Sequence, residues 1–173
     1  MTDRRAEAVP LLDTVLRDHP DHPVALRTRG QFALSASEYA DAERWLSRAA
    51  AARPDDYQTL FLHSQALRQS GRADEADDQA KRAEAAKERQ SRLAELQTRR
   101  LPERPLDAGL YTEMGRLLLS SSDRRDEGVR WLEAAVALDP NHAPAHESLA
   151  AHYAAAGAAE KAAYHRRLAA GGR

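Results

Sequence analysis

The residues best suited to chemistry are the histidines and the serines beside them. His142 and His146 lie four residues apart, a spacing that places two imidazoles on one helix face and can bind a metal ion. However, His142 stands at an expected helix boundary, and no glutamate completes the pattern of a helical metalloprotease. His63 precedes Ser64, but the pair lacks the strand–turn–helix context of a hydrolase nucleophile. We therefore expect capping and packing histidines, with His63 hydrogen-bonded in the core, and we predict no catalytic residue and no metal site.

Other catalytic chemistries lack their residues. The chain has no cysteine, which excludes a thiol nucleophile, a disulfide framework and a thiolate metal site. It also has no glycine-rich phosphate-binding loop. We therefore expect neither a cofactor nor enzymatic activity.

Charge and hydropathy narrow the class of partner. The 173 residues carry 26 Lys+Arg against 27 Asp+Glu, a net charge of -1, whereas phosphate recognition normally leaves a basic excess. No apolar run approaches the roughly 20 residues of a membrane span, and no apolar stretch follows the first residues as in a secretory leader. We expect a cytoplasmic protein with no nucleic-acid partner and no membrane insertion. The high content of alanine and arginine suggests a GC-rich bacterial genome.

The composition favours helices. About a fifth of the residues are alanine and arginine outnumbers lysine, and both are strong helix formers. No segment alternates polar and apolar residues over a useful length, so we expect no strands. Prolines and short polar turns divide the chain into nine expected helices, at about 3–18, 22–35, 38–52, 56–70, 73–100, 107–120, 124–138, 143–156 and 159–170.

One helix ending recurs along the chain. Arg44-Trp45-Leu46 and Arg130-Trp131-Leu132 are each followed, eight residues after the leucine, by proline, at Pro54 and Pro140. Pro20 stands 34 residues before Pro54. Recurrence at a fixed period is the mark of a repeat architecture, in which each unit buries its apolar face only against its neighbours.

This pattern resembles the tetratricopeptide repeat, a 34-residue helix–turn–helix unit. Residues 23–56 carry the small and large residues that this repeat prefers: Leu26, Gly30, Ala33, Ala42, Leu46, Ala49 and Pro54. In phase with them we assign a half repeat at 3–22 and repeats at 23–56, 57–100, 106–142 and 143–173, in one domain. The resemblance implies an all-α, right-handed αα superhelix in which small residues such as Gly30 and Gly115 let paired helices approach, while Leu46 and Leu132 fill the space between repeats. Trp45 and Trp131 adjoin these core positions and are expected to be partly buried.

The resemblance also implies a concave groove lined by the first helix of each repeat. A stiff array presents such side chains without an ordering cost, which suits a non-catalytic scaffold that binds a peptide or partner protein. Arginine pairs with carboxylates, amides bond a peptide backbone and Phe61 anchors a side chain. The clamp by which some family members hold chaperone tails is absent, because Leu62, Gly109 and Glu113 replace its amide and basic residues. The candidate partner-binding residues are Arg27, Gln31, Phe61, Leu62, Gln65, Arg68, Gln69, Thr112 and Arg116.

Two departures from the pattern leave alternatives open. The helix at 73–100 is about twice the usual length, and its distal part carries an apolar stripe at Leu93 and Leu96. This stripe either packs lightly on the next repeat or makes a dimerisation or partner-docking surface. A self-associating assembly module would form through such a homo-oligomer contact or through the alanine-rich last repeat. Pro10 predicts a first helix that is kinked or begins near that residue. A chain that opens on half a repeat is also consistent with an accessory domain of a larger enzyme or secretion protein.

Overall fold

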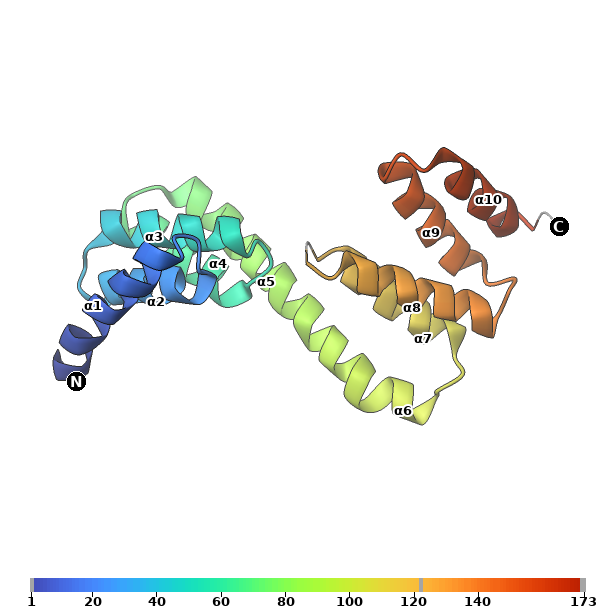
Figure 1. Ribbon diagram of the computed structural model, residues 1–173, viewed down its shortest axis with the longest axis horizontal. Coiled ribbons are helices and arrows are strands. Elements are labelled where there is room, and N and C mark those ends of the chain that lie inside the picture. The colour runs from blue at the N-terminus through green and yellow to red at the C-terminus, as the bar shows by residue number, and fades with distance from the viewer. Residues whose placement is uncertain (1, 122, 172–173) are drawn as a thin grey trace. The chain divides into compact units, whose positions relative to one another are not determined.

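The computed structural model describes residues 2–121 and 123–171, with side chains from Glu7 onward. Throughout these residues the regular structure is helical (Figure 1). Three consecutive elements, α5, the π-helical segment η1 and α6, follow one another without a break, so the described residues form the nine helical segments that the sequence predicts, within three residues of each expected boundary. The elements are α1 (Thr2–Asp18), α2 (Pro23–Ser35), α3 (Tyr39–Ala52), α4 (Tyr57–Gln69), α5 (Ala73–Glu95), η1 (Leu96–Arg100), α6 (Leu101–Glu103), α7 (Ala108–Leu119), α8 (Arg125–Leu138), α9 (Ala143–Ala155) and α10 (Ala159–Ala169).

Two kinds of helix ending account for these boundaries. Helices α1, α3 and α8 each stop two residues before the recurring proline, at Pro20, Pro54 and Pro140, because proline lacks the N–H and clashes with the preceding turn. Helices α2, α4 and α9 are each followed, two residues after their last residue, by a residue in the left-handed conformation: Ser37 (φ 62°), Gly71 (φ 79°) and Gly157 (φ 74°). The next N–H donates back to the helix in all three turns: Glu38 to the Ala33 carbonyl, Arg72 to Leu67 and Ala158 to Tyr153, at 2.9, 3.0 and 2.9 Å. The expected serine-rich turn after α7 includes Ser122, which lies outside the described residues.

The chain forms two compact units, Met1–Glu88 and Arg89–Arg173, and the division falls within α5. In the first unit, the hairpin of α2 and α3 packs against α1 on one side and α4 on the other. Its core gathers leucines and alanines, including Leu26, Leu46 and Ala49, all fully buried. Gly30 faces Leu46 so closely that a Cβ there would lie 2.5 Å from Leu46 Cγ, which confirms the expected close approach of α2 to α3 at Gly30.

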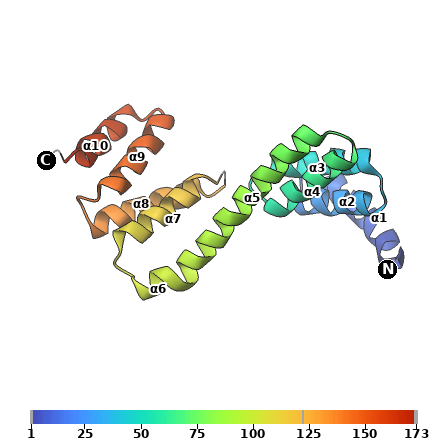
Figure 2. The ribbon, with the colours of Figure 1, turned by 180° about the vertical axis from the view of Figure 1, so that it is seen from behind.

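The second unit repeats this arrangement in two hairpins, α7 with α8 and α9 with α10 (Figure 2). A Cβ on Gly115 of α7 would lie 2.6 Å from Leu132 Cγ of α8. Tyr111 packs edge-on against Trp131 with ring centroids 5.2 Å apart. As expected, Trp131, like Trp45 in the first unit, is half-buried beside the core.

The first helix does not begin near Pro10. Helix α1 starts at Thr2 and continues through that residue to Asp18. Leu16, beyond Pro10, is buried with Leu26 of α2, whereas Leu11 is 69% exposed. Packing of the part of α1 beyond Pro10 on α2 therefore stabilises this helix despite the proline.

Candidate peptide-binding grooves

An open groove of about 740 Å³ crosses the first unit. Its largest contribution comes from one face of α4, where residues 61, 62, 65, 68 and 69 follow the spacing of a single helix surface. The opposite face of α4 carries Leu60 and Leu67, which are buried, so core packing on one side points the other side outward. The groove is lined by Gln31, Leu34, Ser35, Tyr39, Phe61, Leu62, Ser64, Gln65, Arg68, Gln69 and Ala80.

Six of the predicted partner-binding residues lie together here: Gln31, Phe61, Leu62, Gln65, Arg68 and Gln69. The groove also contains Tyr39 of α3 and Ala80 of α5, which were not predicted because they stand on the second helices of their repeats. Tyr39 is the first residue of α3. Its aromatic ring at the turn that follows a groove helix is the sequence signal from which its position in the groove could have been predicted.

The polar chemistry of this groove is dominated by amides. Gln31, Gln65 and Gln69 are exposed and make no side-chain hydrogen bond to the described residues. Arg68 is already paired, because its Nη2 donates to Asp77 Oδ1 at 2.6 Å. Beside them Phe61 leaves 52% of its surface exposed. The arrangement offers free backbone-binding groups next to an apolar anchor, with little net charge.

Two other predicted site residues, Arg27 and Thr112, make contacts within the fold. Arg27 Nη1 donates to Asp56 Oδ2 at 2.7 Å, and the same carboxylate accepts from Thr59 Oγ1 at 2.6 Å while capping the start of α4. Thr112 is 2% exposed and donates to the Ala108 carbonyl within α7. Neither side chain lines this groove or the second groove, described next.

A second groove, of about 510 Å³, lies in the second unit and contains Arg116. The Arg116 guanidinium is oriented by α9: Nε donates to Ser148 Oγ at 2.7 Å and Nη2 to the Pro144 carbonyl at 2.9 Å. Arg125 and His152 were not among the predicted site residues, which include no residue of α8 or α9. The lining residues are Arg116, Leu119, Arg125, Ser148, Ala151, His152, Ala155 and Ala156.

The apolar stripe beyond residue 90 packs within the chain. Leu93 is 8% exposed and Leu96 is fully buried, in a cluster with Leu110, Met114 and Leu118 of α7. Neither leucine is on the surface, so a self-association contact through them would require this cluster to open. Their packing is therefore much firmer than the light contact expected for a solvated arm.

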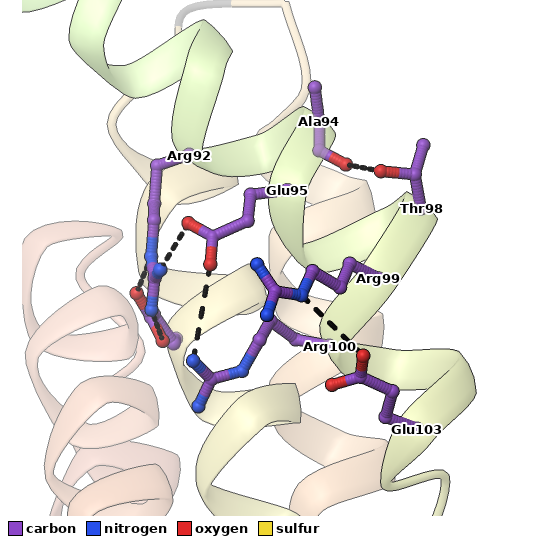
Figure 3. Close-up of polar contacts among 8 residues, drawn as sticks. Arg92, Ala94, Glu95, Thr98, Arg99, Arg100 and Glu103 are labelled. Atoms are coloured by element: carbon purple, nitrogen blue, oxygen red, sulfur yellow. Dashed lines mark hydrogen bonds and ion pairs between the residues drawn. The ribbon is translucent and has the colours of Figure 1, made fainter.

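A salt-bridge network borders this cluster (Figure 3). Arg92 Nε and Nη2 donate to the two oxygens of Glu113, at 2.5 and 2.9 Å, and Nη1 donates to Glu95 at 2.5 Å. Hydrogen bonds to Glu113, and to a smaller extent to Glu95, raise the pKa of Arg92. Bidentate guanidinium–carboxylate pairs are geometrically specific, so this network sets the register of the end of α5 on α7.

The two histidines at the candidate metal-binding spacing, His142 and His146, make their contacts within the fold. His146 is 1% exposed; its Nε2 lies 3.0 Å from the Pro140 carbonyl and its Nδ1 lies 2.9 Å from His165 Nδ1. A carbonyl only accepts, so His146 Nε2 carries the proton and His165 donates through Nδ1. His142 lies 3.6 Å from Asp139. Among the described residues, no three histidine, aspartate or glutamate side chains gather closely enough to hold a metal ion.

His63 is buried as expected but is not hydrogen-bonded. It is 7% exposed, and neither ring nitrogen has a hydrogen-bond partner within the described chain. Glu43 Oε1 lies 3.9 Å from His63 Nε2, beyond hydrogen-bonding distance. Burial lowers the pKa of His63. The prediction that His63 is buried is confirmed, but the prediction that it is hydrogen-bonded is wrong, because α3 does not bring an acceptor close enough to the ring.

Stacked helix hairpins with small-against-large contacts and an open groove define an α-helical repeat protein. Residues 3–62 match the family model of the tetratricopeptide repeat, and the α7–α8 hairpin repeats the glycine–leucine contact of the α2–α3 hairpin. The part of the chain from α1 to the first residues of α4 is therefore a tetratricopeptide-repeat region.

Solved structures of similar fold include two named proteins. A structure of MamA is 16% identical over 97% of this chain and 85% of that one, with a TM-score of 0.44. MamA from Desulfovibrio magneticus RS-1 is 18% identical over 95% and 82%, with a TM-score of 0.42. YrrB, described as a TPR protein with an unusual peptide-binding site, is 17% identical over 91% and 90%, with a TM-score of 0.41. No curated protein matches the sequence. Within residues 2–121 and 123–171, none of the helices has the length and apolar character needed to cross a bilayer.

Proposed function

We propose that this protein is a non-catalytic scaffold whose first-unit groove holds an extended peptide segment of a partner protein. The observation that supports this best is the set of three unpartnered glutamines, Gln31, Gln65 and Gln69, around the exposed ring of Phe61. Each amide offers a donor and an acceptor, which matches the alternating N–H and C=O groups of an extended backbone.

The groove is preorganised for this role. The helices that carry the lining side chains are fixed by a buried cluster in which Ala33 of α2 and Ala66 of α4 pack with Leu46 of α3. The Arg27–Asp56 ion pair joins the same two helices at the start of α4. A peptide that binds a preformed surface avoids the cost of ordering that surface, so a few contacts suffice for useful affinity.

The contacts differ in expected weight. Aromatic anchors carry a large share of binding energy at interfaces, and Phe61 is the exposed aromatic residue of this groove. Arg68 is held by Asp77, with both side chains about 60% exposed. An acidic ligand side chain must therefore compete with Asp77 for Arg68, which makes Arg68 secondary to Phe61 and the amides.

The test selects peptides from a random display library on the full chain and measures the affinity of the selected peptides by fluorescence anisotropy. Phe61→Ala should weaken binding by about tenfold or more, and Gln65→Ala by several-fold. Gln58→Ala is the matched control, because Gln58 is exposed on the same helix but outside the groove. Peptides that bind Phe61→Ala and Gln65→Ala as tightly as the unaltered chain would refute binding in this groove.

A further inference from the structure

The second-unit groove differs in charge from the first. Two arginines line it, and none of the described residues that line it is acidic. Arg125 is exposed and makes no ion pair or side-chain hydrogen bond within the described part of the chain. Arg116 is 51% exposed, and its nearest carboxylate, on Glu147, is 3.9 Å away. Arg125 therefore presents positive charge without an ion pair, and Arg116 has a carboxylate only at 3.9 Å, whereas the arginine of the first groove has one at 2.6 Å.

Besides Ser148 and His152, the other residues that line this groove are apolar. They are Leu119 of α7, Ala151 and Ala155 of α9, and Ala156 directly after α9. These alanines leave room for a side chain to lie against the helix. Arg116 is held in place by Ser148 and the Pro144 carbonyl, so its guanidinium is oriented before any ligand arrives.

We infer that the second-unit groove is a separate binding site for an acidic peptide segment, in which a carboxylate meets Arg116 and Arg125 and a neighbouring aliphatic side chain lies on the alanine surface. Guanidinium–carboxylate hydrogen bonds are among the strongest in proteins, and burial of the aliphatic side chain adds a hydrophobic contribution. Two arginines in a chain of net charge -1 do not suit a nucleic-acid backbone, which calls for a broad basic surface.

This site goes beyond the proposed function, because its residues belong to the other unit and its recognition depends on charge rather than on backbone amides. It rests on the proposed function only in taking a peptide as the ligand. The two sites can therefore be tested independently in the full chain.

The probe is a short fluorescein-labelled peptide in which leucine and aspartate alternate, compared with the same peptide carrying asparagine in place of aspartate. The aspartate peptide should bind about tenfold more tightly or better, and its affinity should fall as salt is raised. Arg125→Gln should remove most of this preference. Arg130→Gln is the matched control, because Arg130 is exposed on the same helix outside the groove.

Two further variants make the outcome decisive. Ala155→Glu places a carboxylate on the exposed end of α9 and should repel the aspartate peptide while keeping helicity, measured by circular dichroism. Phe61→Ala should leave its affinity unchanged. Equal affinity for the two peptides, equal effects of Arg125→Gln and Arg130→Gln, or no binding at all would overturn the inference. Loss of binding in Phe61→Ala alone would also overturn it, and would place the peptide in the first-unit groove, in support of the proposed function.

Discussion

A close approach of two helices in the second unit gives a test of the repeat packing. Gly128 of α8 faces α7, where a Cβ on it would lie 2.8 Å from the Leu119 nitrogen and 2.9 Å from the Gly115 oxygen. Both are backbone atoms, which cannot rotate away as a side chain does. Gly128→Ala therefore forces α7 and α8 apart.

The magnitude follows from two opposed terms. Alanine is favoured over glycine in a helix interior by about 0.8–1 kcal/mol. Overpacking a close contact costs about 1–3 kcal/mol, and a clash with backbone lies in the upper part of that range. The expected net loss of stability is about 1–2 kcal/mol, which for a unit of this size lowers the midpoint temperature by roughly 4–8 °C per kcal/mol.

The assay uses the placement of one tryptophan in each unit. In a Trp45→Phe background, fluorescence of Trp131, which packs on the core of the second unit, reports that unit during urea denaturation. Gly109→Ala is the control, because it makes the same change on exposed α7 surface, where the added Cβ meets only a side-chain oxygen of Asp107 at 3.0 Å. If Gly128→Ala proved as stable as the Gly109→Ala control, the close approach of α7 and α8 would be refuted.

Three other changes probe the first unit by urea denaturation. Ala49→Leu should lower the stability by about 1–3 kcal/mol, because Ala49 is fully buried between α1, α2 and α3; a stable variant would show that the assigned repeat phase is wrong. Ser37→Gly should raise it by about 1 kcal/mol, because Ser37 alone among the three matched turns holds a left-handed conformation without being glycine; no gain would mean that this strain is absent. Burial lowers the pKa of His63, so the unfolded chain takes up that proton first, and stability should be greatest above about pH 6.5 and fall as the pH drops toward the folded pKa. His63→Leu should show a smaller loss between pH 7.5 and pH 5.5, and an unchanged loss would exclude His63 as its cause.

The helix pairing could be predicted from the sequence because it depends on short, periodic features. Gly30 and Leu46 are sixteen residues apart in one repeat, and their contact follows from the phase of two neighbouring helices alone. The proline stops at Pro20, Pro54 and Pro140 act on the helix just before them. Local backbone chemistry and the nearest repeat are sufficient to explain both, and the structure confirms both.

The state of individual side chains could not be predicted in this way. Leu93 and Leu96 lie in a long charged helix, and only the position of α7 shows that they are buried. Thr112 occupies an expected groove position, yet its turn of α7 faces inward. For His63, burial followed from the repeat pattern, but the 3.9 Å separation from Glu43 depends on how α3 and α4 settle against each other.

The arginines at groove positions show why availability differs from position. Arg27, Arg68 and Arg116 all stand on the expected groove face of the first helix of a repeat. The partners of each arginine come from the start of a neighbouring helix or from the residue just before it. The loop before α4 supplies the cap Asp56, which binds Arg27; the second turn of α5 supplies Asp77, which binds Arg68; and the start of α9 offers Arg116 only neutral oxygens within 3 Å. Neutral acceptors orient a guanidinium without cancelling its charge, whereas a carboxylate does both. Groove recognition in this chain thus depends on how closely an acid of the neighbouring helix approaches the groove arginine: Asp77 lies 2.6 Å from Arg68, whereas Glu147, also in the second turn of its helix, lies 3.9 Å from Arg116. Exchanging the closer acid, as in Asp77→Asn, should therefore strengthen the attraction of the first groove for acidic peptides without altering its shape.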